Sequence, residues 1–356
     1  MTTEFMQELQ TIAGEVRVLL ADAALRPNFA PAELLQATLA YPQAGGKALR
    51  PALTTWACLA LGGPRAAALR AGAAIELYHT YTLVHDDVID RDPLRRGRPS
   101  AHALMETVGN ARFGLFGNDA AHYGLSMAIL AGDCLQSWAI DLLGSLPELG
   151  IDPAIALRLI RRMEGVTGPA IVEGEARDIQ LPFTAVNAVR ESDIYRVIRT
   201  KTAALFAYCA WAGALLARGQ EDAQVRALEA FAEEAGIAFQ LQDDVLGIIA
   251  DEATLGKPVG NDLREGKRTL IIALAWARAD AVQRATLTTA LGNPAATPDE
   301  IAQASAILLE SGAVVDTQTI ANDYLQTALL HLEQLPDTPY RTLLHDYASM
   351  MVKREK

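Results

Sequence analysis

The sequence predicts an all-α protein built as one domain, and three observations support this prediction. Ala, Leu, Glu, Gln and Arg fill the long segments of the chain, whereas alternating runs of β-branched residues are nearly absent. A chain of 356 residues, of which 51% are hydrophobic, can bury a large core. No internal repeat and no low-complexity linker divides it. We therefore expect residues 1–356 to form a single bundle of roughly a dozen helices.

Clusters of Gly and Pro mark where the predicted helices end. In chain order they are Gly62 to Pro64, Pro93, Gly97 to Pro99, Gly144 to Pro153, Gly256 to Gly260 and Gly292 to Pro298. Residues 103–124 contain scattered glycines and predict a long connection, either a lid over a site or a surface insertion without a role. The longest apolar run, Ala203 to Ala217, is shorter than the ~20 residues that a membrane-spanning helix needs, so we expect a buried core helix there.

The composition excludes several classes of function. A net charge of −12 argues against a nucleic-acid partner, because a phosphate backbone requires a basic surface; the charge also fits a role in solubility alone. Cys58, Cys134 and Cys209 are odd in number, widely spaced and set in apolar runs, which indicates buried thiols and no disulfide or zinc site. The N-terminal MTTEFMQELQ lacks the apolar core of a signal peptide. Together these features predict a cytoplasmic protein with no transmembrane segment.

Two acidic motifs lie about 157 residues apart. The first, LVHDDVIDRDPLRRGRP, contains Asp86, Asp87 and Asp90, and the second, FQLQDDVLG, contains Asp243 and Asp244. Uncompensated carboxylates are costly in such apolar surroundings. The simplest way to hold them is a cluster of divalent cations that binds a phosphorylated substrate. The motifs therefore indicate chemistry on a diphosphate, and we expect them to face each other across a central cavity.

The spacing within the first motif suits a metal site. Asp86 and Asp90 are four residues apart, so on a helix their carboxylates project from one face. Mg²⁺ prefers oxygen ligands and is commonly held by one or two carboxylates together with substrate phosphates, so this pair can bridge two ions. The alternative is a solvated acidic helix end, because Arg91, Asp92 and Pro93 follow directly.

Cations follow and precede the first motif. The guanidinium forks of Arg95 and Arg96 match phosphate oxygens, although both could instead pair with Asp90 or Asp92 in a surface network. His79 lies seven residues before Asp86, two helical turns away, and therefore shares its face. We interpret it as a substrate-binding residue.

Two further cationic segments are candidates for substrate binding. GGKALRP places Lys47 and Arg50 beside a flexible Gly pair, where they could hold a second anionic group or be ordinary surface charges. Lys201 and Thr202, in RTKTAALF, lie at the start of the long apolar run. A cation and a hydroxyl at that position suit a ligand with a charged head and an apolar tail.

The segment around the second motif adds three candidates. Gln240 lies three residues before Asp243 on the same helix face; it is either structural or faces a polarised substrate. In GKPVGNDLREGKRTL, Lys257 follows a flexible glycine and can reach phosphates. Lys267 is a further substrate-binding candidate, although it could instead join Asp262 in a salt-linked loop.

Taken together, these motifs resemble the trans-isoprenyl diphosphate synthases, or polyprenyl synthetases. The matching segments, in the order and approximate spacing of that family, are GGKALRP, LVHDDVIDRDPLRRGRP, RTKTA, FQLQDD and GKPVGNDLREGKRTL. The resemblance covers about residues 35 to 350. It implies a single-domain helical bundle of the isoprenoid-synthase type around a deep central cavity, usually a homodimer. The motif-bearing core would span about residues 35–275 and the C-terminal helices about residues 276–356.

The resemblance also implies a reaction and a role for each candidate. An allylic diphosphate ionises, isopentenyl diphosphate attacks the cation through its double bond, and a proton leaves. About three Mg²⁺ ions would be bound, two by Asp86 and Asp90 and the third by Asp243, with Asp87 and Asp244 in support. The allylic diphosphate would be held by Arg95, Lys201 and Lys257. Isopentenyl diphosphate would be held by Lys47, Arg50, His79 and Arg96. The carbocation site would be lined by Thr202 and Gln240.

The sequence departs from the family pattern at two places. The second motif usually reads DDxxD, but here Gly247 stands in the last position, so the third ion must rely on Asp243, with or without Asp244. Glycine at this position also occurs in some bacterial geranylgeranyl diphosphate synthases and does not imply inactivity. In the middle motif, EGEARD, the Gln of the family is Glu175, and the acidic partner is Asp178.

Two tyrosines indicate the length of the product. Tyr81 and Tyr78 lie five and eight residues before Asp86, which places their rings about 7.5 and 12 Å below the metal-binding level of a helix. Such rings would form the floor of a pocket for the prenyl tail, or else pack in the core without touching substrate. In the family, an aromatic at the fifth position without an insertion in the motif resembles geranylgeranyl (C20) synthases. We favour C20, with farnesyl (C15) as the alternative.

Two other functional classes share this chemistry. A class I terpene cyclase uses the same metals but binds no second diphosphate, so Lys47, Arg50 and His79 favour the transferase. A non-catalytic partner subunit would be expected to have lost the first aspartate motif, which is intact here.

Overall fold

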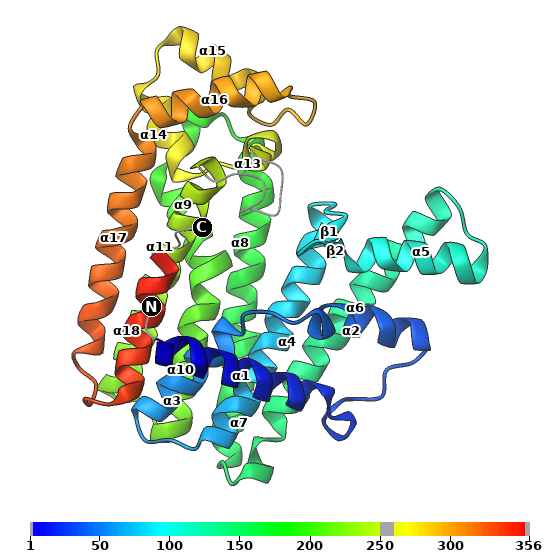
Figure 1. Ribbon diagram of the computed structural model, residues 1–356, viewed down its shortest axis with the longest axis vertical. Helices are drawn as coiled ribbons and strands as arrows, with labels where there is room; N and C mark the ends of the chain where they lie inside the picture. The colour runs from blue at the N-terminus through cyan, green and yellow to red at the C-terminus, as the bar shows by residue number, and fades with distance from the viewer. Residues whose placement is uncertain (1–2, 250–259, 353–356) are drawn as a thin grey trace. The chain divides into compact units, whose positions relative to one another are not determined.

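The structure is a computed structural model that describes residues 3–249 and 260–352. Within these residues the regular structure is almost entirely helical, apart from one short pair of antiparallel strands (Figure 1). This confirms the all-α prediction. By its internal contacts the chain divides into two compact units: Met1–Arg161 with Trp211–Asp222, and Arg162–Ala210 with Ala223–Lys356. A single domain over the whole chain stays a prediction.

The first unit is built from the N-terminal helices. They are α1 (Thr3–Ala21), η1 (Ala23–Leu25), α2 (Ala32–Ala44), α3 (Leu49–Ala60), α4 (Arg65–Ile89), α5 (Ala101–Phe113), α6 (Asn118–Gly144), η2 (Leu146–Leu149) and α7 (Pro153–Arg162). The strands β1 (Leu94–Arg95) and β2 (Arg98–Pro99) form a hairpin between α4 and α5, with Leu94 opposite Pro99 and Arg95 opposite Arg98. The last residues of α10 (Ala204–Arg218) also belong to this unit.

Helix α4 is the central element of the first unit. It packs along α6 and α3, and Gly72 allows the approach to α3, because a Cβ there would lie 2.9 Å from Cα of Pro51. The helix ends at Ile89 since Arg91 adopts a left-handed backbone with φ of 59° and Pro93 follows. The first acidic motif therefore lies on the last turn of α4, and the hairpin follows it directly.

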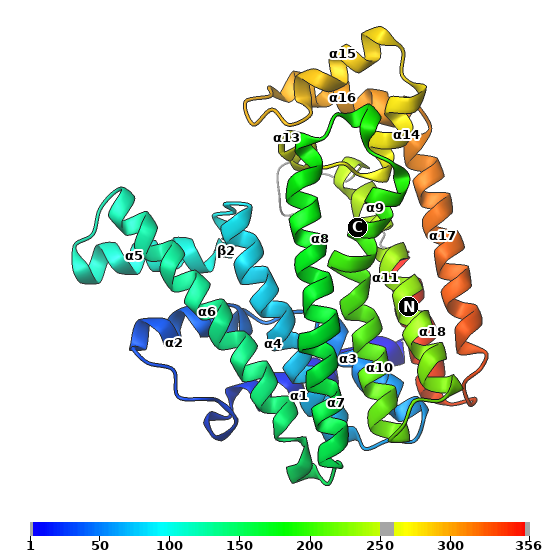
Figure 2. The ribbon, with the colours of Figure 1, turned by 180° about the vertical axis from the view of Figure 1, so that it is seen from behind.

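The second unit contains the remaining helices. They are η3 (Met163–Thr167), α8 (Gly168–Gln180), η4 (Leu181–Phe183), η5 (Val186–Ala188), α9 (Glu191–Val197), η6 (Ile198–Ala203), α11 (Ala223–Ile249), α13 (Asn261–Glu265), α14 (Leu270–Arg278), α15 (Ala281–Ala290), α16 (Pro298–Glu310), α17 (Ala313–Leu332) and α18 (Pro339–Val352). Both η3 and η6 are π-helical turns. Helix α17 lies alongside α11 in both views (Figures 1 and 2).

Helix α11 contains the second acidic motif and is held in place by its buried apolar face. Ile237, Leu241, Val245 and Ile248 recur at spacings of three and four residues and are all buried. Each such side chain contributes about 1.5–3 kcal/mol when fully removed from water. Asp243 falls on the exposed side of the same turns. The apolar stripe thus fixes the helix and leaves this carboxylate accessible.

Residues 103–124 do not form the long connection that the sequence predicts. They contain most of α5 and the start of α6, joined by a short turn in which Gly114 and Gly117 have φ of 65° and 55°. Gly109 gave a misleading signal: it lies inside α5, where a Cβ would be 2.8 Å from the Tyr123 ring of α6. This glycine therefore serves close helix packing and does not break the helix.

Three other expectations concern the core and the surface. The apolar run from Ala203 forms α10, whose Leu205, Phe206 and Leu215 are buried, as predicted. None of the three cysteines forms a disulfide with a residue that the structure describes; Cys58 and Cys209 are buried, as predicted, whereas Cys134 is only half-buried. Among the described helices, none combines the length and apolar character that a membrane crossing requires.

Candidate active site

The first acidic motif is held together by Arg95. The guanidinium of Arg95 returns from the hairpin to the end of α4, where Nε donates to Oδ1 of Asp87 at 2.8 Å and Nη2 to Oδ2 of Asp86 at 3.1 Å. Nη2 also donates to Asp87, whose side chain is fully buried. The hydroxyl of Tyr41, on α2, donates to the other oxygen of Asp87. Asp87 is therefore enclosed by partners, while Asp86 and Asp90 lie partly exposed at the helix end.

The electrostatics agree with this arrangement. Burial opposes the charge of Arg95, but the hydrogen bond and charge of Asp87, with the charge of Asp86, outweigh it and hold the pKa of Arg95 above its ordinary value. Burial, together with the hydrogen bond and charge of Asp87, likewise raises the pKa of Tyr41. Sequence reasoning allowed Arg95 to pair with Asp90 or Asp92; the pairs found are with Asp86 and Asp87. It missed Tyr41, which lies 46 positions from Asp87 and carries no local signal.

A second group of cations surrounds His79 on α4. Burial, and then the charges of Arg50, Arg96 and Arg95, hold the pKa of His79 well below its usual value. The imidazole is therefore neutral. The structure thus brings together three of the four residues predicted to hold isopentenyl diphosphate: Arg50, His79 and Arg96. The fourth, Lys47, is exposed on the loop that precedes α3.

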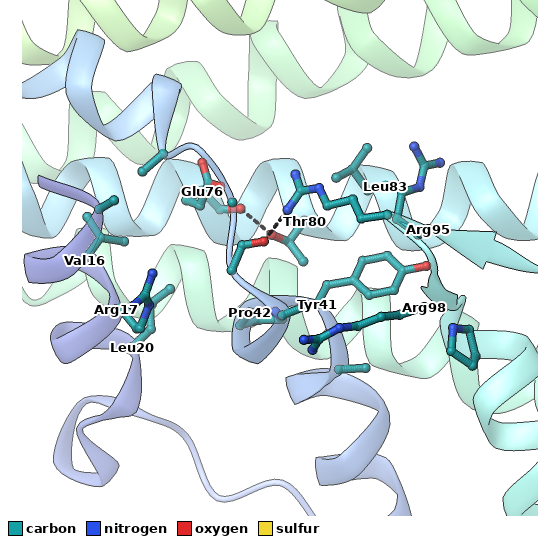
Figure 3. A pocket seen from close by; sticks show the side chains of 18 residues that line it. Val16, Arg17, Leu20, Tyr41, Pro42, Glu76, Thr80, Leu83, Arg95 and Arg98 are labelled. Carbon is teal, nitrogen blue, oxygen red and sulfur yellow. Dashed lines mark hydrogen bonds between the residues drawn. The ribbon is translucent and has the colours of Figure 1, made fainter. Parts of the chain in front are cut away.

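Sequence reasoning also missed Glu76, one turn before His79 on the same helix (Figure 3). Burial raises the pKa of Glu76, and the charges of Arg50 and Arg96 act in the opposite direction. A Cβ at Gly46 would lie 2.9 Å from Nη1 of Arg96 and 3.4 Å from Oε1 of Glu76, and Arg96 donates to the Gly45 carbonyl. The available signal was an acid three residues before a histidine in an otherwise apolar helix.

In the second unit, Lys201 is fixed by the acids of α8. Its Nζ lies 2.7 Å from Oε2 of Glu175 and 2.7 Å from Oδ2 of Asp178. The π-helical turn η6 packs closely on α8 at Gly174, where a Cβ would collide with the backbone of Lys201. Such π turns often occur at functional sites because they redirect side chains.

Glu173, two positions before Glu175 on α8, belongs to a surface network. Its carboxylate accepts from Arg177 at 2.8 Å and from Arg196 at 3.0 and 2.9 Å. The bonds from Arg196 and Arg177 lower the pKa of Glu173 to about 2. Glu173 is therefore committed to the surface, whereas Glu175 and Asp178 hold Lys201.

A hydrogen-bonded chain connects Thr202 with the second acidic motif. Thr202 Oγ1 donates to Oε1 of Gln240 at 2.8 Å, and Nε2 of Gln240 donates to Oδ1 of Asp244 at 2.9 Å. Burial raises the pKa of Asp244 well above its ordinary value; the Gln240 bond opposes this, while the charges of Asp262 and Asp243 add to it. The two neighbouring aspartates thus differ, because Asp243 is exposed and Asp244 is held.

The space beside Gly247, where the family motif has an aspartate side chain, is occupied by the carboxylate of Asp262. A Cβ at Gly247 would lie 3.0 Å from Oδ2 of Asp262, on α13. Nζ of Lys267 lies 3.0 Å from Oε2 of Glu265 and 3.7 Å from Oδ1 of Asp262, so Lys267 takes part in a salt-linked loop. Lys257 lies outside the described residues, and its predicted role is not placed.

The two tyrosines of α4 form a row of rings with His85. Tyr78 is buried and meets Tyr81 edge-on with centroids 5.2 Å apart; Tyr81 meets His85 with centroids 5.0 Å apart. Tyr81 is half-buried. The aromatic row thus ends one residue before the first aspartate of the motif.

The chemistry of these acids fits Mg²⁺. Within residues 3–249 and 260–352, no three His, Cys, Asp or Glu side chains converge into a ready metal cage. Mg²⁺ commonly takes only one or two carboxylates and completes its octahedron with water and substrate phosphates. Asp86 and Asp90, one turn apart and partly exposed, and the exposed Asp243 supply donors of that kind.

Comparisons with known proteins identify the class of the chain. The polyprenyl synthetase family model matches residues 31–308. The chain is 34% identical over 327 residues to a geranylgeranyl diphosphate synthase of Sulfolobus acidocaldarius, with 91% of this chain and 92% of that protein covered. The chain therefore belongs to the polyprenyl synthetase family.

Solved structures agree with this assignment. A geranylgeranyl pyrophosphate synthetase from Pyrococcus horikoshii matches with a TM-score of 0.85 and 32% identity over 99% of both chains. A geranylgeranyl pyrophosphate synthase from Corynebacterium glutamicum, complexed with isoprenyl diphosphate and magnesium, matches with a TM-score of 0.82 and 29% identity, covering 99% of this chain and 98% of that one.

Proposed function

We propose that the chain is a Mg²⁺-dependent short-chain prenyltransferase that condenses isopentenyl diphosphate with an allylic diphosphate and yields geranylgeranyl diphosphate. The observation that carries this proposal is the presence of two neighbouring cationic groups, although the charge of Arg95 also acts on His79. Arg95 lies with the carboxylates of the first motif, and Arg50 and Arg96 lie around His79. A transferase needs sites for two diphosphates, whereas a cyclase needs only one.

The first group suits release of the allylic diphosphate. We assign Asp86 and Asp90 to two Mg²⁺ ions and Asp243 to a third. When bound, Mg²⁺ supplies positive charge that stabilises the departing diphosphate. We assign Arg95 and Lys201 to its oxygens, and the same role of Lys257, which lies outside the described residues, stays a prediction. Asp87 and Asp244 act through their neighbours: Asp87 positions Arg95, and Asp244 positions Gln240.

The second group suits isopentenyl diphosphate. Arg50, Arg96 and the exposed Lys47 provide charge, and the forked guanidinium groups match phosphate oxygens. His79, kept neutral by burial and by these cations, can donate a hydrogen bond without adding to their mutual repulsion. This arrangement holds the nucleophile by its head and leaves its double bond free to attack.

Thr202 and Gln240 suit the stabilisation of a carbocation. The amide of Gln240 donates to Asp244, which fixes its oxygen toward Thr202, and the hydroxyl proton of Thr202 is committed to that oxygen. The lone pairs of Thr202 Oγ1 are then available to face positive charge. After the new carbon–carbon bond forms, the released diphosphate accepts the proton, so no further base is required.

Prenyl transfer is tested by incubating the purified protein with Mg²⁺, isopentenyl diphosphate and farnesyl diphosphate, and sizing the hydrolysed products by chromatography. A C20 alcohol is the expected product. If none of the C5, C10 and C15 allylic diphosphates is elongated, the transferase proposal is wrong. Hydrocarbon released from geranylgeranyl diphosphate alone would indicate a cyclase, and no reaction of any kind a partner subunit.

The product length is assigned to Tyr81, with C15 as the alternative. Tyr81→Ala removes the half-buried ring next to Tyr78, so we expect products longer than those of the wild-type protein. Tyr340→Ala, at the start of α18, is the matched control and should leave the distribution unchanged. An unchanged distribution in Tyr81→Ala would remove this ring from the floor of the pocket.

The homodimer, the cytoplasmic location and the number of three ions remain predictions. An exposed apolar row on α6, formed by Leu125, Ile129 and Leu130, supports the dimer, because contiguous exposed apolar side chains mark interaction surfaces.

A further inference from the structure

The first unit contains a small cavity beside the isopentenyl diphosphate group. Its volume is about 60 Å³, and it lies among α1, the Gly45–Gly46 loop, α4 and the hairpin (Figure 3). Its charged lining residues are Arg17, Glu76, Arg95, Arg96 and Arg98. The rest of the wall is formed by apolar side chains, among them Val16 and Leu20, together with Tyr41 and Thr80. Lys47, Arg50 and His79 do not line it.

The lining carries an excess of positive charge. The charge of Arg95 is neutralised by ion pairs with Asp86 and Asp87. Three arginines, Arg17, Arg96 and Arg98, then stand against the single carboxylate of Glu76. Arg17 and Arg98 form no ion pair with any residue that the structure describes, and they come from different elements, α1 and β2. Positive groups brought to one cavity from separate elements favour an anion there.

The size of the cavity selects the anion. One water needs about 10–15 Å³ of such volume, so 60 Å³ holds about four to six waters. A phosphate group has five heavy atoms and is of this size, whereas a prenyl diphosphate is far larger. Guanidinium forks bind phosphate oxygens in pairs, which suits three arginines around one group.

We propose that this cavity is a further anion site beside the two diphosphate sites, and that it binds one phosphate group between Arg17, Arg96 and Arg98. It is distinct from the isopentenyl diphosphate group and shares only Arg96 with it. The ligand is either inorganic phosphate or one end of the inorganic diphosphate that prenyl transfer releases. Because the N–H donors of Arg96 cannot serve both ligands at once, an anion in the cavity weakens binding of isopentenyl diphosphate.

Binding of the anion is measured without metal or prenyl substrate, so failure of this site and failure of the proposed function are distinguishable. Isothermal titration calorimetry of the full chain in EDTA and chloride buffer measures the binding of inorganic phosphate and of inorganic diphosphate. Arg17→Ala and Arg98→Ala should each weaken binding about five- to tenfold. Arg161→Ala, an exposed arginine of α7 in the same unit, should leave it unchanged. Circular dichroism checks that each variant is folded.

Lys47→Ala separates the two sites, because it should weaken isopentenyl diphosphate binding while phosphate binding stays within about twofold. The inference is overturned if the wild-type protein binds neither anion, if Arg17→Ala and Arg98→Ala bind phosphate like the wild-type protein, or if Lys47→Ala loses phosphate binding as well. Comparing the two anions identifies the source: tighter binding of diphosphate points to the reaction product, and equal binding to phosphate alone.

A kinetic measurement, which rests on the proposed function, adds the consequence. Inorganic phosphate should inhibit competitively with isopentenyl diphosphate, and Arg17→Ala should raise the inhibition constant by the same factor as the dissociation constant. Inhibition that is unchanged in Arg17→Ala while phosphate binding is weakened would contradict the shared use of Arg96.

Discussion

Neighbouring aspartates of the first motif have different surroundings and therefore different predicted roles. Asp87 is fully buried against Arg95 and Tyr41, whereas the side chain of Asp86 is 22% exposed. The family resemblance implies metal binding for Asp86 and a supporting role for Asp87. The sequence does not predict how Asp87 is enclosed, since this depends on Tyr41, far away in the chain. Local spacing places donors on a helix face; the partner that encloses one of them comes from tertiary packing.

Substitution to asparagine separates these two roles. Asp87→Asn leaves the partly buried Arg95 without its main counter-charge and should lower the free energy of unfolding by about 2–4 kcal/mol. Asp86→Asn should change stability by less than about 1 kcal/mol, yet slow prenyl transfer at least about 100-fold. Urea unfolding and initial rates measure the two effects, with Asp119→Asn, exposed on α6, as the control. Near-normal activity in Asp86→Asn would contradict the metal assignment.

His79 gives a prediction about pH. Its pKa lies well below the usual 6.5, so the folded protein keeps the imidazole neutral while the unfolded chain binds a proton as the pH falls below 6.5. The unfolded state then holds more protons, and the free energy of unfolding falls by up to about 1.4 kcal/mol per pH unit below that value. Urea titrations at about pH 7.5 and about pH 5.5 should show a smaller loss for His79→Gln than for the wild-type protein.

The raised pKa of Glu76 has the opposite effect on the pH dependence of stability. As the pH falls, the folded protein takes up a proton at Glu76 before the unfolded chain does, which raises the free energy of unfolding. Both proteins contain Glu76, so this contribution largely cancels in their difference. An equal loss of stability in the two proteins would mean that His79 takes up a proton in the folded state.

At the level of elements, apolar periodicity predicts the existence of the main helices but not their local irregularities. The spacing of Ile237, Leu241 and Val245 predicts α11, because buried side chains repeat with the period of an α-helix. The π-helical turn at Lys201 leaves no such signal, since it changes the backbone by one residue within a helical sequence. The glycines of residues 103–124 led to the wrong prediction of a long connection. In the sequence, a glycine that permits close helix packing cannot be told from one that ends a helix.

Gly174 provides a test of how η6 is placed on α8. A methyl group at Gly174 would meet the backbone of Lys201, so Gly174→Ala should force the two elements apart, weaken the Lys201–Asp178 pair and cost about 1–3 kcal/mol of stability. Gly165→Ala is the matched control, because no atom lies within 4 Å of its Cβ position. Thermal unfolding and the kcat/KM for the allylic diphosphate report the two effects. Wild-type values in Gly174→Ala would show that this packing has no influence on Lys201.

For the whole molecule, the order of the motifs along the chain is sufficient to predict the family and the fold class. It does not predict how internal contacts divide the chain, since the division falls inside α10, after Ala210, and each compact unit combines segments that are distant in sequence. Nor does it define an assembly surface, because the exposed apolar side chains of α6 are recognisable only once burial is known.

Self-association is predicted at this scale. If Leu125, Ile129 and Leu130 form a subunit interface, Ile129→Glu should convert a dimer into a monomer, because a buried unpaired carboxylate opposes association. Val282→Glu, on the more exposed Val282 of α15, is the control and should leave the mass unchanged. Size-exclusion chromatography with light scattering gives the mass. A monomeric wild-type protein would contradict the dimer itself.

The ion pairs of Arg95 and Lys201 have a consequence for how ligands bind. In each unit a cation assigned to the leaving diphosphate is already neutralised by carboxylates: Arg95 by Asp86 and Asp87, Lys201 by Glu175 and Asp178. A metal ion bound by Asp86 would compete with Arg95 for that carboxylate and would leave guanidinium donors for phosphate. A phosphate bound by Arg95 would in turn leave the carboxylate for the metal ion. By reciprocal linkage, each ligand must raise the affinity for the other by the same factor. Metal ion and diphosphate would therefore bind with positive cooperativity, and the substrate would ionise only when both are bound.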